Sequence, residues 1–254
     1  MQFKDFDKNF MLNGKVFIVT GGAGGIGRVI GEFFACKGAN GILADTSESV
    51  ESIAEKMGLV GFKADLTQKD KPAGLVDFAV KKFGKLDILV NCAGIGPLDK
   101  AEDMPEEIFE KTLSINLKVP FLTSQAAARV MISKREGGCI INIASQAGIV
   151  AIDGHIAYST SKAALIGMTK SMAFEWGKYG ICVNAVSPTV INTDLSTGGT
   201  YWVGDVAARA LENTPAGRFG EPIEVAALCA YLASDAASLI TGANIVIDGG
   251  YTIH

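Results

Sequence analysis

The chain has 254 residues, of which 48% are hydrophobic and 20% charged, a balance that suits a folded protein and excludes a disordered one. Its formal net charge of −4 would repel phosphate backbones, so we expect no nucleic-acid partner. Apolar runs are too short to span a membrane, and the charged, aromatic start is unlike a signal peptide. We therefore expect a cytoplasmic protein with no membrane partner.

Cysteine and histidine usage argues against a metal centre. The five cysteines lie far apart, with no Cys-x-x-Cys spacing, and are interpreted as reduced residues. The only histidines are His155 and His254, so a zinc site of the usual kind is not expected.

Short apolar runs alternate with longer amphipathic runs along the chain. Strands are predicted at 16–20, 41–45, 59–63, 86–91, 139–144, 181–186 and 244–247. Helices are predicted at 26–37, 69–83, 106–133, 158–178 and 221–233. This alternation indicates an α/β fold: a single-domain, Rossmann-like doubly wound sheet of seven parallel strands with helices on both faces. Ligands of such sheets bind beyond the carboxyl ends of the strands.

Two segments lie outside this pattern of strands and helices within the single domain, 1–254. Residues 1–13 form an N-terminal extension. Residues 188–215 have no strong strand signal, although 203–211 has a helical pattern. Because this stretch follows a strand's carboxyl end and contains Gly198 and Gly199 as hinges, we interpret it as a substrate lid. The alternative is a surface insertion.

A glycine-rich turn, Thr20-Gly-Gly-Ala-Gly-Gly-Ile-Gly27, joins the first strand to the first helix. Glycines adopt positive φ angles and let backbone N–H groups approach a pyrophosphate at a helix N-terminus. Any tight turn can use glycines, but the preceding strand and following helix favour a dinucleotide site.

Asp45 closes the second strand, where a carboxylate would meet the adenosine ribose hydroxyls. A 2′-phosphate there would meet like charge, so the sequence favours NAD over NADP. Arg28 is a cation that could still reach such a phosphate. The alternative role for Asp45 is to cap a helix that begins near Glu48.

Tyr158 and Lys162 are four residues apart in a helical pattern, so their polar ends share one face. A free tyrosine has a pKa of about 10, and a neighbouring ammonium lowers it, which would make the phenol an acid/base group. An ordinary amphipathic helix, with a packed tyrosine and an extended lysine, explains the bare pattern more often. The pair therefore needs support from the rest of the chain.

From about Gly14 to Gly250 the chain resembles the short-chain dehydrogenase/reductase family. The glycine turn, Asp65-Leu66 and Asn91-Cys-Ala-Gly94 are similar to successive motifs of that family, with Cys92 replacing an asparagine. The catalytic tetrad implied by the resemblance is Asn116, Ser145, Tyr158 and Lys162. The implied cofactor contacts, together with Asp45, are Gly21, Gly25, Ile26, Gly27, Asp65, Leu66, Asn91, Ala93, Gly94, Tyr158, Lys162, Pro188, Ile191 and Thr193.

The resemblance also implies a role for each member of the tetrad. Tyr158 exchanges a proton with the substrate, Ser145 holds the reacting oxygen, and Lys162 favours the phenolate and binds the cofactor ribose. Asn116 binds a water that leads to the lysine. Without the resemblance, Asn116 indicates a kink in the predicted 106–133 helix.

The sequence favours an NAD-dependent oxidoreductase that interconverts a secondary alcohol and a ketone on a small polyol, sugar alcohol or diol. Pro188-Thr189, where the family usually has Pro-Gly, resembles members acting on sugars and polyols. The expected substrate contacts are Gln146, His155, Asn192 and Trp202. The resemblance also implies a homotetramer paired through the helix carrying Tyr158 and the long helix before it.

Two other functions stay open. One is a 3-oxoacyl-carrier-protein reductase, which the chain resembles over 215–222 and which would prefer NADPH. It would need a basic docking patch, for which Arg129, Lys134 and Arg135 are candidates. The other is an NAD-binding redox sensor without turnover, which the filled catalytic positions disfavour.

Overall fold

The structure is a computed structural model that describes residues 6–193 and 204–253. In this part of the chain seven strands form one sheet in the order β3-β2-β1-β4-β5-β6-β7, and every neighbouring pair is parallel. The strands are β1 (Val16–Thr20), β2 (Asn40–Asp45), β3 (Val60–Lys63), β4 (Ile88–Asn91), β5 (Gly138–Ile143), β6 (Ile181–Pro188) and β7 (Asn244–Ile247). The predicted seven-stranded parallel sheet is confirmed, with strand ends shifted by one or two residues.

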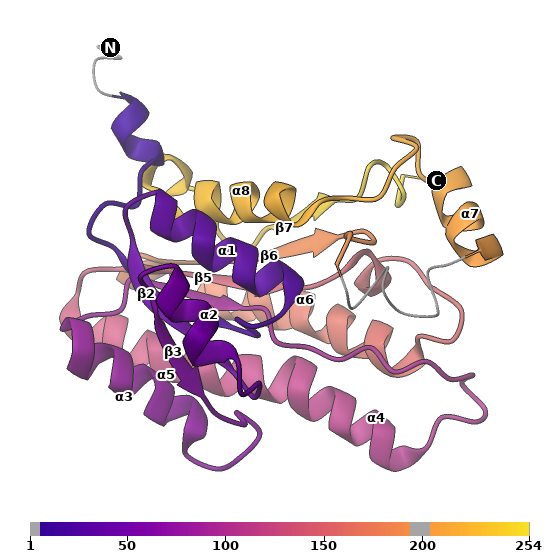
Figure 1. Cartoon of the computed structure of the whole chain (residues 1–254), viewed down its shortest axis with the longest axis horizontal. Coiled ribbons are helices and arrows are strands. Elements are labelled where there is room, and N and C mark those ends of the chain that lie inside the picture. The colour runs from indigo at the N-terminus through magenta and orange to yellow at the C-terminus, as the bar shows by residue number, and fades with distance from the viewer. Residues whose placement is uncertain (1–5, 194–203, 254) are drawn as a thin grey trace.

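Helices cover both faces of the sheet (Figure 1). One face carries α1 (Gly25–Cys36), α2 (Val50–Lys56) and α8 (Pro222–Ala233). The other carries α3 (Lys71–Phe83), α4 (Glu106–Leu113), α5 (Val119–Lys134) and α6 (Ile156–Trp176). Helix α2 was not among the predicted helices because it is only seven residues long. Helix α7 (Gly204–Glu212) matches the helical pattern within the predicted lid.

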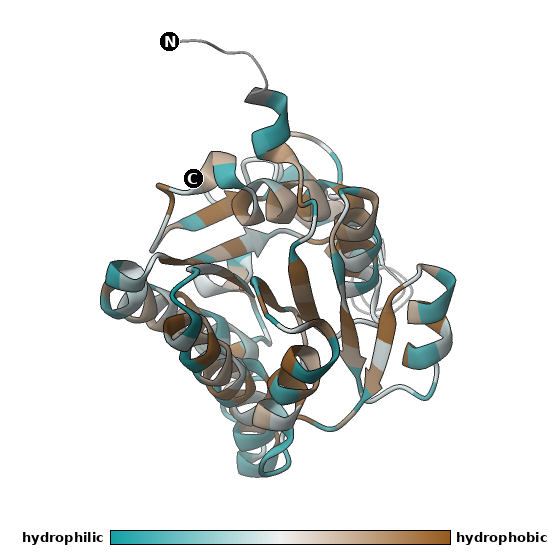
Figure 2. Ribbon diagram, turned by 90° about the vertical axis from the view of Figure 1, so that its left-hand side faces the viewer, coloured by the Kyte–Doolittle hydropathy of each residue, from teal (hydrophilic) through white to brown (hydrophobic). Residues whose placement is uncertain are grey.

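The period-two alternation of each strand divides the core into two layers. Phe17 and Val19 of β1 point to the layer under α1 and α8, whereas Ile18 points to the layer against α3 and α5. All three are fully buried. Figure 2 shows the apolar strands enclosed between helices whose outer surfaces are hydrophilic. Because both faces are covered, the strands are mostly apolar along their length, as parallel strands usually are.

The predicted 106–133 helix is interrupted at Asn116. A π-helical turn, η2 (Ser114–Lys118), separates α4 from α5, and the N–H of Val119 donates to the carbonyl of Ser114. Such turns add a residue to the helix and are frequent at functional sites. The kink expected at Asn116 is therefore confirmed, and it buries that side chain, which is only 1% exposed.

The sheet order reverses between β1 and β4. The chain leaves β1 toward β2 and β3 on one side, then crosses back to place β4 against the other side of β1. Thr20 pairs with Asn91 at the carboxyl ends of these two strands. Connections that diverge in this way leave a crevice at the switch point, where ligands of doubly wound sheets bind.

The described part of the N-terminal extension, residues 6–13, packs against the folded unit. A short 3₁₀ turn, η1 (Phe6–Phe10), places the ring of Phe10 on Tyr231 of α8, with 6.1 Å between the ring centroids. Leu12 is fully buried in the core. The end of the predicted extension thus belongs to the folded unit. Among the described helices, none combines the length and apolar character needed to cross a membrane.

Candidate active site

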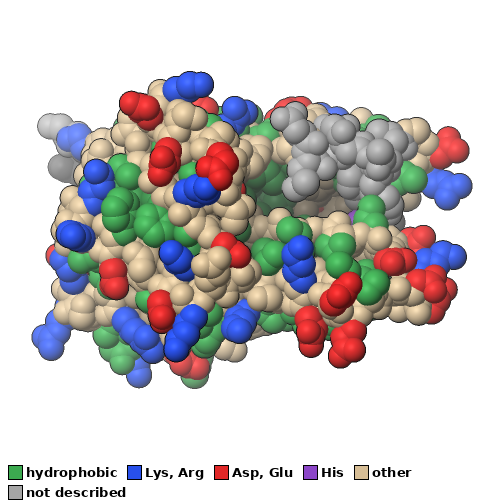
Figure 3. All heavy atoms as spheres, turned by 60° about the horizontal axis from the view of Figure 1, so that its bottom comes forward, with side chains coloured by type: hydrophobic (Ala, Val, Ile, Leu, Met, Phe, Trp, Pro, Cys, Tyr) green, Lys and Arg blue, Asp and Glu red, His purple; other side chains and the backbone are tan. Residues whose placement is uncertain are grey.

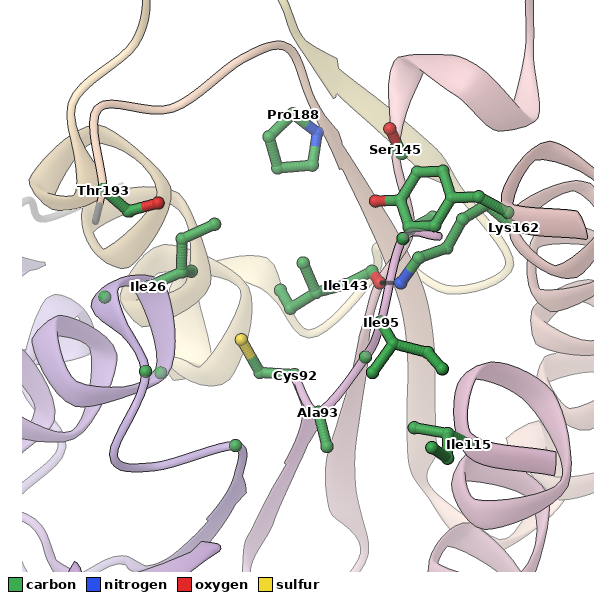
Figure 4. A pocket seen from close by; sticks show the side chains of 18 of the residues that line it. Ile26, Cys92, Ala93, Ile95, Ile115, Ile143, Ser145, Lys162, Pro188 and Thr193 are labelled. Atoms are coloured by element: carbon green, nitrogen blue, oxygen red, sulfur yellow. Dashed lines mark hydrogen bonds between the residues drawn. The ribbon is translucent and has the colours of Figure 1, made fainter. Parts of the chain in front are cut away.

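A cavity of about 630 Å³ lies at the carboxyl ends of the strands. The loops after β1 through β6 contribute to it, together with η2, α5 and α6, and Figure 4 shows several of the side chains converging on it. The cavity brings together most of the residues predicted for cofactor and catalysis: Gly21, Gly25, Ile26, Gly27, Asp45, Asp65, Leu66, Ala93, Gly94, Ser145, Tyr158, Lys162, Pro188, Ile191 and Thr193. Asn91 and Asn116 are absent from the lining.

The glycine turn is compact because its glycines touch other backbone. Gly21 has φ +69°, and a Cβ at Gly27 would lie 2.2 Å from the carbonyl oxygen of Gly21. A Cβ at Gly25 would lie 2.6 Å from Cγ2 of Thr193. Gly24, which the sequence prediction missed, is the N-cap of α1 and offers no side-chain cap. The first N–H groups of α1 are thus left for an anion at the cavity, which fits a pyrophosphate.

Asp45 is held in place by two backbone donors. Its Oδ2 accepts from the N–H of Ala23 in the glycine turn, and its Oδ1 accepts from the N–H of Ser47, both at 3.0 Å. Helix α2 begins only at Val50, so the alternative role as its cap is not seen. Arg28 is exposed on α1 and does not line the cavity. The fixed carboxylate beside the turn fits a ribose diol.

The loop after β4 is fixed by Thr20, a residue that the sequence prediction missed. Its hydroxyl oxygen accepts from the N–H groups of Cys92 and Ala93, at 3.1 and 3.2 Å. This places the loop directly against the glycine turn, where a Cβ at Gly21 would lie 2.9 Å from Ala93. The signal available in the sequence was a polar residue at the end of an otherwise apolar strand.

Asn91 holds the sheet together behind the cavity. Its side-chain amide donates to Ser124 and to Asn142 on the next strand, at 2.9 and 2.8 Å, and accepts from Thr123 at 2.7 Å. These bonds fix Asn91 and with it the start of the following loop, which lines the cavity. The cofactor contact that the resemblance implies for Asn91 stays a prediction.

Asn116, in the π-helical turn, forms hydrogen bonds to the loop after β4. Its Oδ1 accepts from the N–H of Ile95 at 2.9 Å, and its Nδ2 donates to the Ile95 carbonyl at 2.8 Å and to Ser161 at 3.0 Å. These three bonds fix the Asn116 side chain, and the water that the resemblance implies at this residue stays a prediction. The visible role of Asn116 is to hold Ile95, which lines the cavity.

Ser145, Tyr158 and Lys162 meet at the inner end of the cavity. Ser145 follows β5 and caps a short 3₁₀ turn, η3 (Gln146–Gly148), by accepting from the N–H of Ala147 at 3.1 Å. Lys162 is 4% exposed and donates to the carbonyl of Ile143 at 2.7 Å, a bond visible in Figure 4. Its Nζ lies 5.5 Å from the centroid of the Tyr158 ring. The helical spacing has brought both polar ends to the cavity.

Comparison with known proteins agrees with this geometry. The family described as Enoyl-(Acyl carrier protein) reductase matches residues 21–252. The chain is 48% identical over 256 residues to an NAD-dependent glycerol dehydrogenase from Listeria innocua, with 100% of both chains covered. The chain belongs to the short-chain dehydrogenase/reductase family. It is therefore an oxidoreductase built for a nicotinamide cofactor.

Further members of the short-chain dehydrogenase/reductase family support the assignment. A D-threitol dehydrogenase from Mycolicibacterium smegmatis is 43% identical over 255 residues, covering 98% of this chain and 96% of that protein. The crystal structure of a short-chain type dehydrogenase/reductase from Mycobacterium marinum superposes with a TM-score of 0.92 at 37% identity, covering 97% of this chain and 99% of that one. The doubly wound fold is shared over nearly the whole length.

Burial dominates the electrostatics of this short-chain dehydrogenase site. Burial raises the pKa of Tyr158, and a hydrogen bond with Ser145 only partly offsets that rise. Burial also lowers the pKa of Lys162, to about 8, and its ammonium donates to the carbonyl of Ile143. The expectation that Lys162 and the oxidised nicotinamide together favour the phenolate concerns the protein with its cofactor and stays a prediction.

Cys92 lies inside the site but is not reactive. Burial raises the pKa of its thiol to about 12, so it remains protonated. In Figure 4 its sulfur points into the pocket from the loop after β4. Cys92, which replaces the family's asparagine, thus lines the cavity as a small, partly exposed apolar residue. No group of three or more potential metal ligands occurs among the described residues.

Two predicted substrate contacts line the cavity. Gln146 is 2% exposed, and its Oε1 has no hydrogen-bond partner within the described part of the chain. His155 is buried, its Nδ1 lies 2.7 Å from the carbonyl of Asp153, and burial lowers its pKa. Asn192 lies outside the lining and donates to Glu221 instead. Trp202, with 194–203 of the predicted lid, falls outside the described residues.

The sequence prediction missed most of the apolar wall of the cavity. Beside Ile95, which lies in the expected substrate segment 94–97, this wall consists of Leu98 from the loop after β4, Ile115 from η2 and Ile152 from the loop after β5. Isolated apolar residues in loops carry little signal, because only the fold shows that they face a common space.

Burial of the Lys162 ammonium gives a testable pH dependence. Between about pH 8 and pH 10.5 the unfolded chain binds a proton that the folded chain does not, so stability should rise with pH through this lysine. Relative to Lys162→Met, the wild type should gain about 2 kcal/mol of unfolding free energy between pH 7 and pH 9.5. Urea unfolding at both pH values measures this. Lys170→Met, which removes an exposed lysine of α6, is the control and should show no such change with pH. A difference in unfolding free energy between wild type and Lys162→Met that is the same at both pH values would contradict the prediction.

Proposed function

We propose that this protein uses NAD to interconvert a secondary alcohol and a ketone on a small polyol, sugar alcohol or diol. The observation that carries the proposal is one continuous cavity, which extends from Asp45 and the glycine turn to Ser145, Tyr158 and Lys162. The names of the relatives, a glycerol dehydrogenase and a D-threitol dehydrogenase, support the polyol as substrate class.

The cofactor fits the residues present at the strand ends. Asp45 would accept the ribose hydroxyls, the open N–H groups at the start of α1 would hold the pyrophosphate, and Thr193 would hold the carboxamide. When bound, NAD⁺ accepts the hydride that leaves the alcohol carbon. The same residues leave the end of the cavity at Tyr158 for the substrate.

The chain's own groups would handle the proton. Ser145 and Tyr158 hold the substrate hydroxyl, and Tyr158 takes its proton as the carbon is oxidised. Since burial raises the tyrosine pKa in the protein alone, positive charge beside the ring is required to favour the phenolate. Lys162 supplies part of that charge from 5.5 Å, and the oxidised cofactor adds the rest.

The substrate end of the cavity suits an uncharged, hydroxylated molecule. Gln146 offers an unsatisfied amide oxygen to a second hydroxyl, while apolar residues form the remaining wall. Among the described lining residues Lys162 is the only lysine or arginine, and it is engaged by Ile143. A carboxylate or phosphate on the substrate would therefore find no free cation, which favours polyols over sugar acids.

Replacing the proposed acid/base residue should separate binding from chemistry. Tyr158→Phe should bind NAD as the wild type does, because its ring is retained, but should lose about 10²- to 10⁴-fold in turnover. Calorimetric NAD titration and initial rates with a polyol panel measure the two effects. An active Tyr158→Phe enzyme would contradict the acid/base role. NAD binding by the wild type without turnover of any alcohol would instead favour the redox sensor.

The carboxylate of Asp45 should determine the cofactor preference. The wild type should use NAD⁺ in preference to NADP⁺, and Asp45→Asn, which removes only the charge, should reduce that preference about tenfold or more. The ratio of kcat/KM for the two cofactors measures it. Arg28→Gln tests whether the exposed arginine contributes. Strong NADPH preference with reduction of acyl thioesters would overturn the assignment in favour of the 3-oxoacyl-carrier-protein reductase.

We also propose that the protein is a cytoplasmic homotetramer that pairs through α5 and α6. An exposed stripe on α6 contains the small residues Ala163 and Gly167 and ends at Phe174, which is 91% exposed. A groove beside it, between η2, α5 and α6, includes Phe121, which is 42% exposed. Elsewhere on the face shown in Figure 3, basic and acidic side chains are interspersed. The five free thiols are compatible with a reducing compartment.

Gly167 gives a selective test of this pairing. A Cβ at Gly167 would meet nothing within 4 Å of the same chain, so Gly167→Gln should leave the subunit folded but obstruct close helix pairing. Sedimentation velocity should show a wild-type tetramer and smaller species for the variant. Gly74→Gln, at a helical glycine of α3 with equally open surroundings, should remain a tetramer. A tetrameric Gly167→Gln protein would contradict pairing through this surface.

A further inference from the structure

The segment after β6, residues 190–193, is joined to the segment before α8. Ile191 forms a parallel bridge with Gly220, the N–H of Asn192 donates to the Gly220 carbonyl at 2.8 Å, and the N–H of Gly220 donates to the carbonyl of Val190 at 3.0 Å. Ile191 and Thr193 line the cavity, whereas Gly220 does not. A segment outside the cavity therefore supports a segment inside it.

The two segments are also in tight side-chain contact. A Cβ at Gly220 would lie 2.5 Å from Cδ1 of Ile191, and Ile191 is only 4% exposed. Two residues after Ile191, the side chain of Thr193 packs on Gly25 of the glycine turn. Figure 4 shows Thr193 and Ile26 on the same side of the pocket. A shift of residues 218–221 would consequently move side chains at the cofactor end of the cavity.

One side-chain hydrogen bond completes this support. Nδ2 of Asn192 donates to Oε1 of Glu221, the N-cap residue of α8. The N–H of Glu221 donates to the Glu224 carboxylate at 2.8 Å. The guanidinium of Arg218 donates to both oxygens of that carboxylate, at 2.7 and 2.8 Å. The hydrogen bonds from Arg218 and from the Glu221 N–H lower the pKa of Glu224 to about 2, so this carboxylate stays charged. Glu221 is thus held on a rigid helix start.

We propose that the Asn192–Glu221 pair, which lies outside the cavity, is a positioning device for the nicotinamide end of the cofactor site. By fixing Asn192, Glu221 sets where Ile191 and Thr193 stand relative to the glycine turn. Asn192 was expected to contact substrate, and its bond to Glu221 assigns it this different role. The inference rests on the proposed use of NAD by this cavity.

A swap of hydrogen-bond polarity tests the pair. Asn192→Asp places a second carboxylate against Glu221 and should weaken NAD binding about five- to tenfold. Glu221→Gln keeps an acceptor oxygen and should bind NAD nearly as the wild type does. In the double variant, the amide introduced at 221 can donate to the carboxylate introduced at 192, so NAD affinity should return to within about twofold of the wild type. Calorimetric titration with NAD gives all four affinities.

The double variant separates positioning from simpler effects. It retains the new negative charge at position 192, so repulsion of the cofactor by that charge alone would leave its affinity as low as that of Asn192→Asp. That result, or unchanged binding by Asn192→Asp, would overturn the proposal. Asn213→Asp adds a charge at an exposed position after α7 and should not change the affinity. Thermal melting of each variant reports folding separately, and failure of the wild type to bind NAD would instead reject the proposed function.

Discussion

The parallel arrangement of the sheet is the constraint from which the whole site follows. Because all seven strands run in one direction, their carboxyl ends share one edge, and the loops that leave them meet there. The reversal of strand order between β1 and β4 opens that edge into a crevice. Asp45 and Pro188 end different strands, Ser145 closely follows a third, and the three are far apart in the sequence. They line one cavity because the strand ends share an edge.

Within that crevice, polar side chains that never face the cavity give it its shape. Thr20 binds the loop after β4 from the neighbouring strand, Asn91 ties β4 to β5 and α5, and Asn116 holds Ile95 from the π-helical turn. Each is buried and has its hydrogen bonds satisfied within the protein. Buried polar groups with complete partners act as rigid supports, because breaking any of them would leave an unsatisfied group. At the surface, the Asn192–Glu221 hydrogen bond supports the segment after β6 in a similar way.

Burial makes the charged forms of two residues in the site unfavourable, the ammonium of Lys162 and the phenolate of Tyr158. Burying Lys162 costs stability, since its ammonium loses water and gains only the Ile143 carbonyl and a distant ring face. Burial disfavours the phenolate of Tyr158 in the same way. A charged ligand that enters this buried site would shift the protonation equilibria of both groups, as proton transfer at this position needs.

Much of this could be predicted from the sequence because the responsible signals are local. Strand and helix periods identified the seven-stranded sheet, the glycine turn and Asp45 are adjacent to their strands, and four-residue spacing placed Tyr158 beside Lys162. The asparagine at position 116, within a helical run, indicated the interruption of that helix. The apolar residues Leu98 and Ile115 of the cavity wall carried no comparable local signal.

The sequence by itself determined the fold class, the family and the chemical types at the site, since these depend on residue order and spacing. Only the tertiary structure decided how the groups act on one another. Burial is the largest influence on the tyrosine pKa, and Asn91 and Asn192 support the cavity from outside it. Such outcomes depend on solvent exclusion and on contacts between distant segments, and neither is encoded in the spacing of residues along the chain.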